Sequence, residues 1–420
     1  EFERGLNYFE KALAIALEIF DGANHTLAQT YLNIGIMYGY AGKQDLELAY
    51  LLKANAMQRE LYGVNHSAVA FTYNRIGKHY SNVGDYNNAL VYLEKALTIN
   101  STLMGEINPN LAEYYMNLCE MYSELRIFNK ALEYGEKALE IRLAVFGEGH
   151  YRVGKSYSKL AEVFYETGRY TIALNYYSRA LNNFTKENKL SSAILVVNYY
   201  TAACYYELGD LENALLFCQK SIPIEFPDYH ISEPLNFSYL SMVQFHTVKA
   251  NALLASILFE QYKKTGDPKD IELALVNYQV TLKLLRKYNS IVVNSTQKQL
   301  TRLDQFNYIF EDAIQTSIAY YNITGNTTSL DWAFEVSEYS KALTLQKVIS
   351  ASRAISFAGI PDSLISLEEA IRTELADARA RFESQLGVEN PDDKIIEEMK
   401  NTLADITIEY ERLILLLETD

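Results

Sequence analysis

The sequence contains few residues that interrupt helices, with 7 prolines and 19 glycines among 420 residues. Proline breaks a helix and glycine weakens it, so their scarcity favours long helices joined by short turns. Long apolar runs are also missing: no stretch of 18 apolar residues occurs, which argues against a membrane-spanning helix and any membrane contact from this segment. Since 49% of the residues are hydrophobic, the chain can still bury a large core.

Cysteine is scarce as well. The chain has three, Cys119, Cys204 and Cys218, without CxxC or Cys–His ligand spacing. An odd number excludes a fully paired disulfide framework and indicates a reducing compartment, so we expect the cytoplasm. The sequence opens at Glu1 inside a helical pattern. We therefore expect a piece of a longer protein, in which any targeting information, including a signal for export, would lie upstream of Glu1.

Positive charge is not concentrated anywhere along the sequence. The net charge is −15, and acidic and basic residues are interspersed. A duplex nucleic-acid surface needs a basic stripe, so this class of partner is excluded, whereas a protein or peptide partner is compatible.

Tyrosine, by contrast, is abundant, with 34 residues, and it recurs at a fixed interval. Tyr31, Tyr73, Tyr115 and Tyr157 are 42 residues apart, and seven residues later comes a second aromatic series. The second series is Tyr38, Tyr80, Tyr122, Phe164 and Tyr205, and between the two lies a small residue: Gly35, Gly77, Cys119, Ala161 and Ala202. This spacing predicts the first helix of a repeated helical pair, with the small residue allowing a second helix close approach.

The second helix of each pair repeats too. Alanines mark it at two positions seven residues apart: Ala89, Ala131, Ala173 and Ala214, then Ala96, Ala138 and Ala180. The turn before it carries Gly42, Gly84, Gly168 and Gly209, suited to a helix C-terminus that requires positive φ. Residues 1–20 have the pattern of a second helix whose first helix is absent.

These units resemble tetratricopeptide (TPR) repeats. Their length, and the loops Tyr62-Gly-Val-Asn-His66 and Phe146-Gly-Glu-Gly-His150, are similar to those of kinesin light chains over residues 1–190. The resemblance implies a right-handed superhelix whose first helices line a concave groove. His25, His66 and His150 fall at one position of the repeat loop, so we interpret them as structural and too far apart to share a metal ion.

Beyond residue 190 the register loosens. We expect degenerate TPR-like pairs at 242–262 with 270–288 and 298–323 with 328–351, then an antiparallel helical hairpin of 362–386 and 392–418. The predicted fold is therefore all-α: a TPR solenoid over 1–225, degenerate helical pairs over 226–351, and a linker turn with a coiled hairpin over 352–420.

A second resemblance lies towards the C-terminal end. The stretch Trp332-Ala-Phe-Glu-Val-Ser-Glu-Tyr-Ser-Lys-Ala-Leu-Thr-Leu-Gln, followed by Phe357-Ala-Gly-Ile-Pro-Asp-Ser-Leu364, resembles the region that joins TPR arrays to CHAT domains in bacterial TPR–CHAT proteins. It covers residues 240–420. The resemblance implies a regulatory TPR part in cis with a caspase-like cysteine protease domain, which we expect after Asp420.

The candidate binding residues come from the predicted groove. Two residues after each Tyr31-type position lie Asn33, Arg75, Asn117, Lys159 and Tyr200. The kinesin-light-chain resemblance implies an asparagine here that holds the backbone of an extended peptide, because an amide both donates and accepts; this chain matches at Asn33 and Asn117 only. Gln29, Phe71, Glu113 and Lys155 lie one turn away, and Glu120, Glu124, Glu162 and Glu166 make the middle of the groove acidic.

We find no catalytic, metal or cofactor site in the sequence. The favoured function is a scaffold that binds a protein or peptide in the concave groove and controls the CHAT domain. Two alternatives stay open. One is a stand-alone TPR adaptor without an enzyme in cis, and the other is a hydrolase that uses His79 or His246 with nearby carboxylates.

Overall fold

A computed structural model describes residues 2–20, 22–104, 108–186, 191–226, 244–292 and 306–357, with single positions at Ala370, Ile371, Glu374, Arg381 and Thr402. Within these ranges every regular element is a helix and no strand occurs, which confirms the predicted all-α class. The chain divides into two units, Glu1–Val336 and Ser337–Asp420. In the described residues, no helix is both long and apolar enough to cross a membrane.

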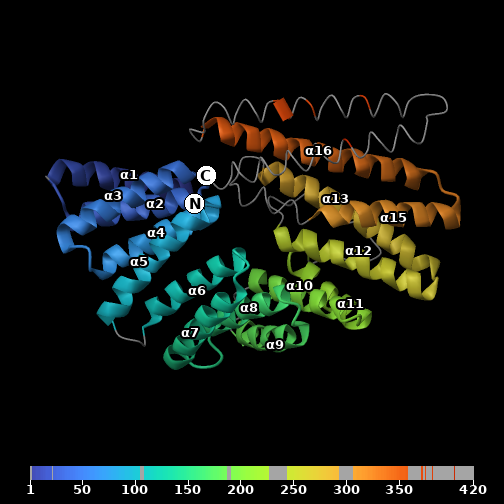
Figure 1. Cartoon of the computed structure of the whole chain (residues 1–420), viewed down its shortest axis with the longest axis horizontal. Coiled ribbons are helices and arrows are strands. Elements are labelled where there is room, and N and C mark those ends of the chain that lie inside the picture. Colours follow the sequence, from blue (N-terminus) through green and yellow to red (C-terminus); the bar gives the residue numbers. More distant parts are fainter. Residues whose placement is uncertain are drawn as a thin grey trace. The chain divides into compact units, whose positions relative to one another are not determined.

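The first unit begins with α1 (Phe2–Ile19) and continues as helical pairs in chain order (Figure 1). The first helices are α2 (His25–Tyr40), α4 (Ser67–Val83), α6 (Pro109–Glu124), α8 (Tyr151–Glu166) and α10 (Ser191–Glu207). Their partners are α3 (Gln44–Tyr62), α5 (Tyr86–Met104), α7 (Phe128–Phe146), α9 (Tyr170–Lys186) and α11 (Leu211–Ser221). Each second helix packs on its own first helix, and α3, α5, α7 and α9 also pack on the next one, so the units stack as a solenoid.

The small residue of each first helix lies where the second helix comes closest. A Cβ atom added to Gly77 would lie 2.7 Å from Leu93 Cγ and 3.2 Å from the Ala89 carbonyl oxygen. Cys119 and Ala161, at the same repeat position, are 0% exposed. Packing therefore accounts for the small-residue series, as predicted, and Cys119 belongs to it.

Aromatic side chains, nearly all of them tyrosines, form one triad in each of the four pairs from α2/α3 to α8/α9. In the α4/α5 pair, Tyr92 lies between Tyr73 and Tyr80, with ring centroids 5.7 and 5.5 Å away. The same triad recurs as Tyr31, Tyr50 and Tyr38; Tyr115, Tyr134 and Tyr122; and Tyr157, Tyr176 and Phe164. In each triad a cation lies over the first outer ring, at Lys53, Lys95, Lys137 and Arg179. The three lysines also lie over the central ring. A third aromatic series, 42 residues apart, therefore lies between the two series identified in the sequence: Tyr50, Tyr92, Tyr134 and Tyr176.

The first helices α2, α4, α6 and α8 each begin at a side-chain cap. His66 and His150 accept a hydrogen bond through Nδ1 from the backbone N–H of Ala68 and Arg152, at 3.2 and 3.1 Å. At the same repeat position, Asn24 and Asn108 cap α2 and α6 through Oδ1. The structural role predicted for the repeat histidines holds for His66 and His150. The assignment of His25 to that position was wrong by one residue, because Asn24 caps α2 and His25 Nδ1 instead lies 2.5 Å from the Tyr62 hydroxyl.

The turns within the pairs use a left-handed residue. Gly42, Gly84, Gly168 and Gly209 have φ between 72° and 86°, as predicted. The equivalent residue of the α6/α7 turn is Arg126, whose φ is 59°. It is the one non-glycine residue with positive φ among the described residues, and its Cβ strains a backbone that glycine adopts freely.

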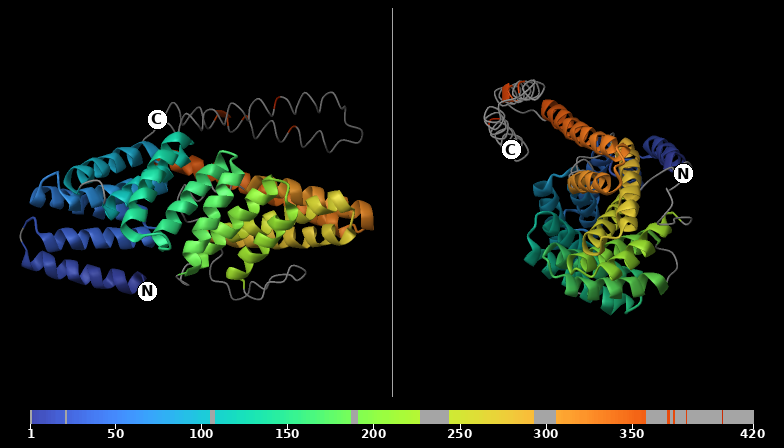
Figure 2. Two further views of the ribbon diagram at one scale, coloured as in Figure 1. Left: turned by 90° about the horizontal axis from the view of Figure 1, so that it is seen from below. Right: turned by 90° about the vertical axis from the view of Figure 1, so that its right-hand side faces the viewer.

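Further helices follow residue 226 along the chain. They are α12 (Phe245–Thr265), α13 (Pro268–Val292), α15 (Asn307–Thr324) and α16 (Thr328–Phe357), following a short 3-10 turn, η1 (Ile222–Ile224). Helix α13 packs on both α12 and α15, and the three lie side by side in both views of Figure 2. The expected turn at Phe357–Leu364 lies outside the described residues, except for Phe357 itself. The expected hairpin helices also lie outside them, except for the single positions given above.

Candidate functional site

The first helices share an exposed stripe on the side opposite their partners. Because α2 contacts α4, α4 contacts α6, α6 contacts α8 and α8 contacts α10, these stripes adjoin. We call this surface the inner face. Its most prominent residues are Gln29, Asn33, Phe71, Arg75, Lys78, Asn110, Glu113, Glu120, Arg152, Lys155, Lys159 and Glu162. All five predicted binding residues fall on first helices, but the structure gives them different surroundings.

The two asparagines of the proposed backbone clamp differ in access. Asn33 is half-buried, and its Oδ1 accepts a hydrogen bond from Gln29 Nε2 at 3.2 Å. Asn117 is 7% exposed, and its Nδ2 donates to Asn74 Oδ1 at 2.8 Å, which ties α6 to α4. The amide of Asn117 therefore already serves a contact between repeats, while Asn33 stays within reach of a ligand.

Lys159 and Tyr200 are also engaged with neighbours. The Lys159 ammonium lies 2.6 Å from Glu162 Oε2, and its side chain is 25% exposed. Burial opposes its charge, yet the carboxylates of Glu162 and Glu120 outweigh burial and raise the pKa of Lys159 above its ordinary value. Tyr200 stacks on Tyr177 with ring centroids 5.7 Å apart. The acidic middle of the groove is therefore partly neutralised from within.

Arg75 lies in a cavity of about 290 Å³ that three first helices enclose together. We call it the cationic cavity. Helices α4, α6 and α8 supply all but one of its lining residues, and Arg142 from α7 completes it: Phe71, Asn74, Arg75, Lys78, Pro109, Asn110, Glu113, Tyr114, Arg142, Tyr151, Arg152 and Lys155. Five of these side chains are cationic and one is acidic. This concentration of positive charge is local, since the whole chain carries −15.

Arg142 forms the buried back of this cavity. Its side chain is 5% exposed and donates to Ser156 Oγ at 2.9 Å, to the Arg152 carbonyl oxygen at 3.2 Å and to Glu113 Oε2 at 3.0 Å. Burial lowers the pKa of this guanidinium, and the Glu113 charge acts against that shift. Beside it, burial raises the pKa of Tyr114 to about 12, so its hydroxyl is a neutral donor at neutral pH.

A second cavity, also of about 290 Å³, adjoins the first and shares Phe71, Asn110 and Tyr114 with it. We call it the amide cavity, because Gln29, Gln58, Asn100 and Asn110 line it and no charged side chain does. Asn100 is 2% exposed, and its Oδ1 has no hydrogen-bond partner. The two adjoining cavities are lined by residues from α2 to α8, with amides at one end and cations at the other.

The sequence prediction missed Arg142, Lys78 and Arg152. A signal for Arg142 was present: Gln58, Asn100 and Arg142 are 42 residues apart, at one polar position on otherwise apolar second-helix faces. All three are buried and line the two cavities. A repeated buried polar position is costly unless it serves a bond or a ligand.

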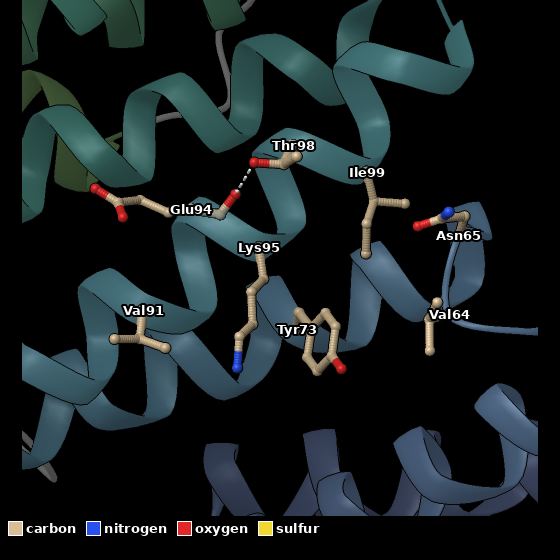
Figure 3. A pocket seen from close by; sticks show the side chains of 8 residues that line it. All are labelled: Val64, Asn65, Tyr73, Val91, Glu94, Lys95, Thr98 and Ile99. Carbon is tan, nitrogen blue, oxygen red and sulfur yellow. Dashed lines mark hydrogen bonds between the residues drawn. The ribbon is translucent and has the colours of Figure 1, made fainter.

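A larger hollow, of about 450 Å³, lies between α5 and the loop before α4 (Figure 3). Its rim includes Val64 and Val91, which are 50% and 46% exposed. The Lys95 ammonium extends towards the Tyr73 ring, 5.9 Å from its centroid, as Figure 3 shows. One cation, Lys95, and one carboxylate, Glu94, line this hollow, so it lacks the concentration of charge found in the cationic cavity.

The residues considered for catalysis are all packed. His79 is 4% exposed, and its Nδ1 lies 2.9 Å from Glu47 Oε2 in the contact between α3 and α4. His246 lies against Tyr199 and Tyr200, with ring centroids 5.9 and 5.8 Å away. The three cysteines are free and buried, and burial raises the pKa of Cys119 and of Cys204 to about 12, the reverse of what a nucleophile needs. The described residues contain no group of His, Cys, Asp or Glu side chains that could hold a metal ion.

Comparison with known proteins agrees with this architecture. Residues 27–68, 72–103 and 110–186 each match a model described as tetratricopeptide repeat. The chain therefore contains TPR repeats, and its scaffold is of the protein-interaction class. The search among curated proteins found no match.

Several solved structures are similar to this chain. The apo form of the quorum sensor NprR from B. thuringiensis is 16% identical, with a TM-score of 0.55, over 82% of this chain and 83% of that one. BtubC (BKLC) from P. vanneervenii is 20% identical, with a TM-score of 0.48, over 58% of this chain and 98% of its own. A putative kinesin light chain from Podosopora anserina is 15% identical, with a TM-score of 0.38, over 45% and 89%. The first of these shows that the likeness extends beyond the regular repeats.

Proposed function

We propose that this chain is a regulatory scaffold that binds an extended segment of a protein or peptide on its inner face, without catalysis of its own. The observation that carries the proposal is the pair of adjoining amide and cationic cavities, whose lining comes mainly from the first helices of four consecutive repeats. An extended peptide has a repeating amide backbone, which the side chains of Gln29, Asn33 and Asn110 can pair with as donors and acceptors.

The structure supports a modified set of binding residues. Asn33, Arg75, Lys159 and Tyr200 keep part of their surface on the inner face. We propose that Asn33 and Arg75 contact the ligand directly and that Lys159 and Tyr200 flank it. Asn117 acts through Asn74, by holding α4 and α6 in register.

We further propose that ligand binding controls a CHAT caspase-like protease domain in cis, in a protein of the bacterial TPR–CHAT type. This part of the proposal rests on the resemblance of residues 332–346 and 357–364 to the TPR–CHAT junction. Three unpaired thiols support a reducing compartment, the cytoplasm. Reading the coding sequence past the codon of Asp420 tests the coupling. A strand–helix segment with His and Cys motifs supports it, whereas a stop codon favours the stand-alone adaptor.

Selection from a random peptide display library against the whole chain tests the binding function. We expect peptides whose affinity falls in an Asn33→Ala, Tyr200→Ala variant and is retained in a Val91→Ala, Leu216→Ala variant. Val91 and Leu216 are exposed on the second helices α5 and α11, so they serve as the matched control. Recovery of no ligand, or equal affinity for both variants, would count against the inner face as the binding surface.

A further inference from the structure

The cationic cavity has a charge that its own surroundings do not balance. Its five cations face one lining carboxylate, Glu113, and that carboxylate is bonded to Arg142. For Arg75, Lys78, Arg152 and Lys155, no ion pair occurs within the described part of the chain. Like charges gathered in one hollow repel each other, so the unliganded cavity is electrostatically unfavourable.

One donor in this cavity is buried and unused. Arg75 Nε has no hydrogen-bond partner, while the guanidinium carbon of Arg75 lies 5.1 Å from the centroid of the Phe71 ring. A buried N–H that lacks an acceptor costs free energy, and a bound acceptor removes that cost. Stacking on Phe71 also fixes the plane of the guanidinium, which prepares it for a planar, two-oxygen partner.

The cavity also has walls that suit a peptide side chain. Phe71, Tyr114 and Tyr151 give it apolar surface, and the neutral Tyr114 hydroxyl adds a donor. Arg152 and Lys155 are exposed at its mouth, where they lie over the Tyr151 ring at 5.9 and 5.5 Å. These side chains would meet an incoming anion before the deeper Arg75.

We propose that the cationic cavity binds the carboxylates of an acidic peptide segment, with Arg75, Lys78, Arg152 and Lys155 as its ligands. This inference rests on the proposed peptide-binding function and names the chemistry of the partner. The peptide backbone continues into the adjoining amide cavity across Phe71. Glu113 acts as an internal carboxylate that keeps the buried Arg142 neutralised when no peptide is present.

Fluorescence anisotropy with the whole chain tests this proposal. The probes are fluorescein-labelled hexaglutamate and, as a neutral control of equal length, hexaglutamine. We expect hexaglutamate to bind at low salt and hexaglutamine to bind at least about 10-fold more weakly. The net charge of −15 repels an acidic peptide, so its binding requires a local cationic site.

Charge reversal locates the site. Arg152→Glu with Lys155→Glu, both exposed at the cavity mouth, should weaken hexaglutamate binding about 10-fold or more. Lys264→Glu with Lys269→Glu, at the end of α12 and the start of α13, changes the net charge equally and should leave binding unchanged. Unaltered circular dichroism and melting midpoints verify that both variants fold. Arg75→Gln is a second, milder variant that removes one charge inside the cavity.

Three outcomes overturn the inference. They are equal binding of the two probes, equal losses in the two reversal variants, and complete displacement of hexaglutamate by an equimolar amount of inorganic phosphate, which would mark a phosphate site. Display-selected peptides separate this failure from that of the proposed function. If such peptides bind the inner face and tolerate Arg152→Glu with Lys155→Glu, the scaffold function stands and the acidic-peptide inference falls.

Discussion

The guanidinium of Arg142, 5% exposed, donates to the carboxylate of Glu113, 53% exposed, at 3.0 Å. This contact joins the buried side of a second helix to the ligand-accessible side of a first helix. A core residue of α7 thereby fixes the position of a carboxylate on the inner face. The pair therefore contributes to the packing of the repeat and lowers the net positive charge of the cationic cavity.

Glu113→Gln should therefore have two separable effects. Removing the acid raises the positive charge of the cavity, so hexaglutamate should bind several-fold more tightly. The unfolding free energy should fall by no more than about 1 kcal/mol, because Glu113 is half exposed and Arg142 keeps Ser156 and the Arg152 carbonyl. Anisotropy and urea denaturation measure the two. Glu140→Gln, on the exposed side of α7, changes the net charge by the same amount and serves as the control. Equal affinities of the two variants for hexaglutamate would refute the role of Glu113.

Asn117→Ala tests whether this asparagine is a ligand clamp or a structural residue. The substitution leaves Asn74 Oδ1 without its buried donor, so we expect a loss of about 1–3 kcal/mol in unfolding free energy. Adding Asn74→Ala should recover part of that loss, because the unpaired acceptor is then gone. Urea denaturation of the two single variants and the double variant gives the unfolding free energies for a double-mutant cycle. Additive losses would show that the two amides are not coupled.

Arg126→Gly should stabilise the protein. Its φ of 59° falls where the other repeats carry glycine, and a residue with a Cβ atom is strained there. We expect the free energy of unfolding to rise by up to about 1 kcal/mol, less whatever is lost with the contact between Arg126 and the Phe128 ring. Thermal melting measures it. The converse change, Gly84→Ala in the α4/α5 turn, should destabilise by a similar amount, and a destabilised Arg126→Gly variant would contradict this reading.

The three thiols should be inert in the folded chain. Burial raises the pKa of Cys119 from its ordinary 9.0 to about 12, and Cys204 shifts likewise. Since folding holds these thiols protonated, their contribution to stability is full below about pH 9 and is lost as the pH rises from 9 towards 12. Reaction with a disulfide reagent at pH 8 should be slow in buffer and complete for all three in urea. Fast labelling of the native chain would contradict their burial.

The periodic features of this fold were readable from the sequence. The 42-residue interval located the first helices, the close-approach positions at Gly77 and Cys119, and the turns at Gly84 and Gly168, because each depends on local geometry that repeats with the chain. The interval also contained the cap position and the central tyrosine of each triad. Only the histidines of the cap position were predicted to be structural, because the cap alternates between Asn and His. The central tyrosines were not predicted, because Tyr92 lies on the opposite helix from Tyr73 and Tyr80.

The binding surface was less predictable, since it depends on contacts between repeats. Asn33 and Asn117 occupy equivalent positions, yet one is half-buried and the other is 7% exposed, because Asn117 meets Asn74 of the preceding repeat. The sequence predicted that the middle of the groove is acidic. The structure shows that Lys159 neutralises part of it and that the unbalanced charge, of opposite sign, is gathered around Arg75.

Site-specific photo-cross-linking tests the binding scaffold most directly. A benzoylphenylalanine residue is placed at Asn33 or Lys155 on the inner face, or at Val91 or Leu216 on the second helices, and each chain is illuminated with a display-selected peptide. The account predicts cross-linked peptide at Asn33 and Lys155, reduced by an excess of unlabelled peptide, and background levels at Val91 and Leu216. Cross-linking that is strongest at Val91 or Leu216 would contradict an inner-face binding site.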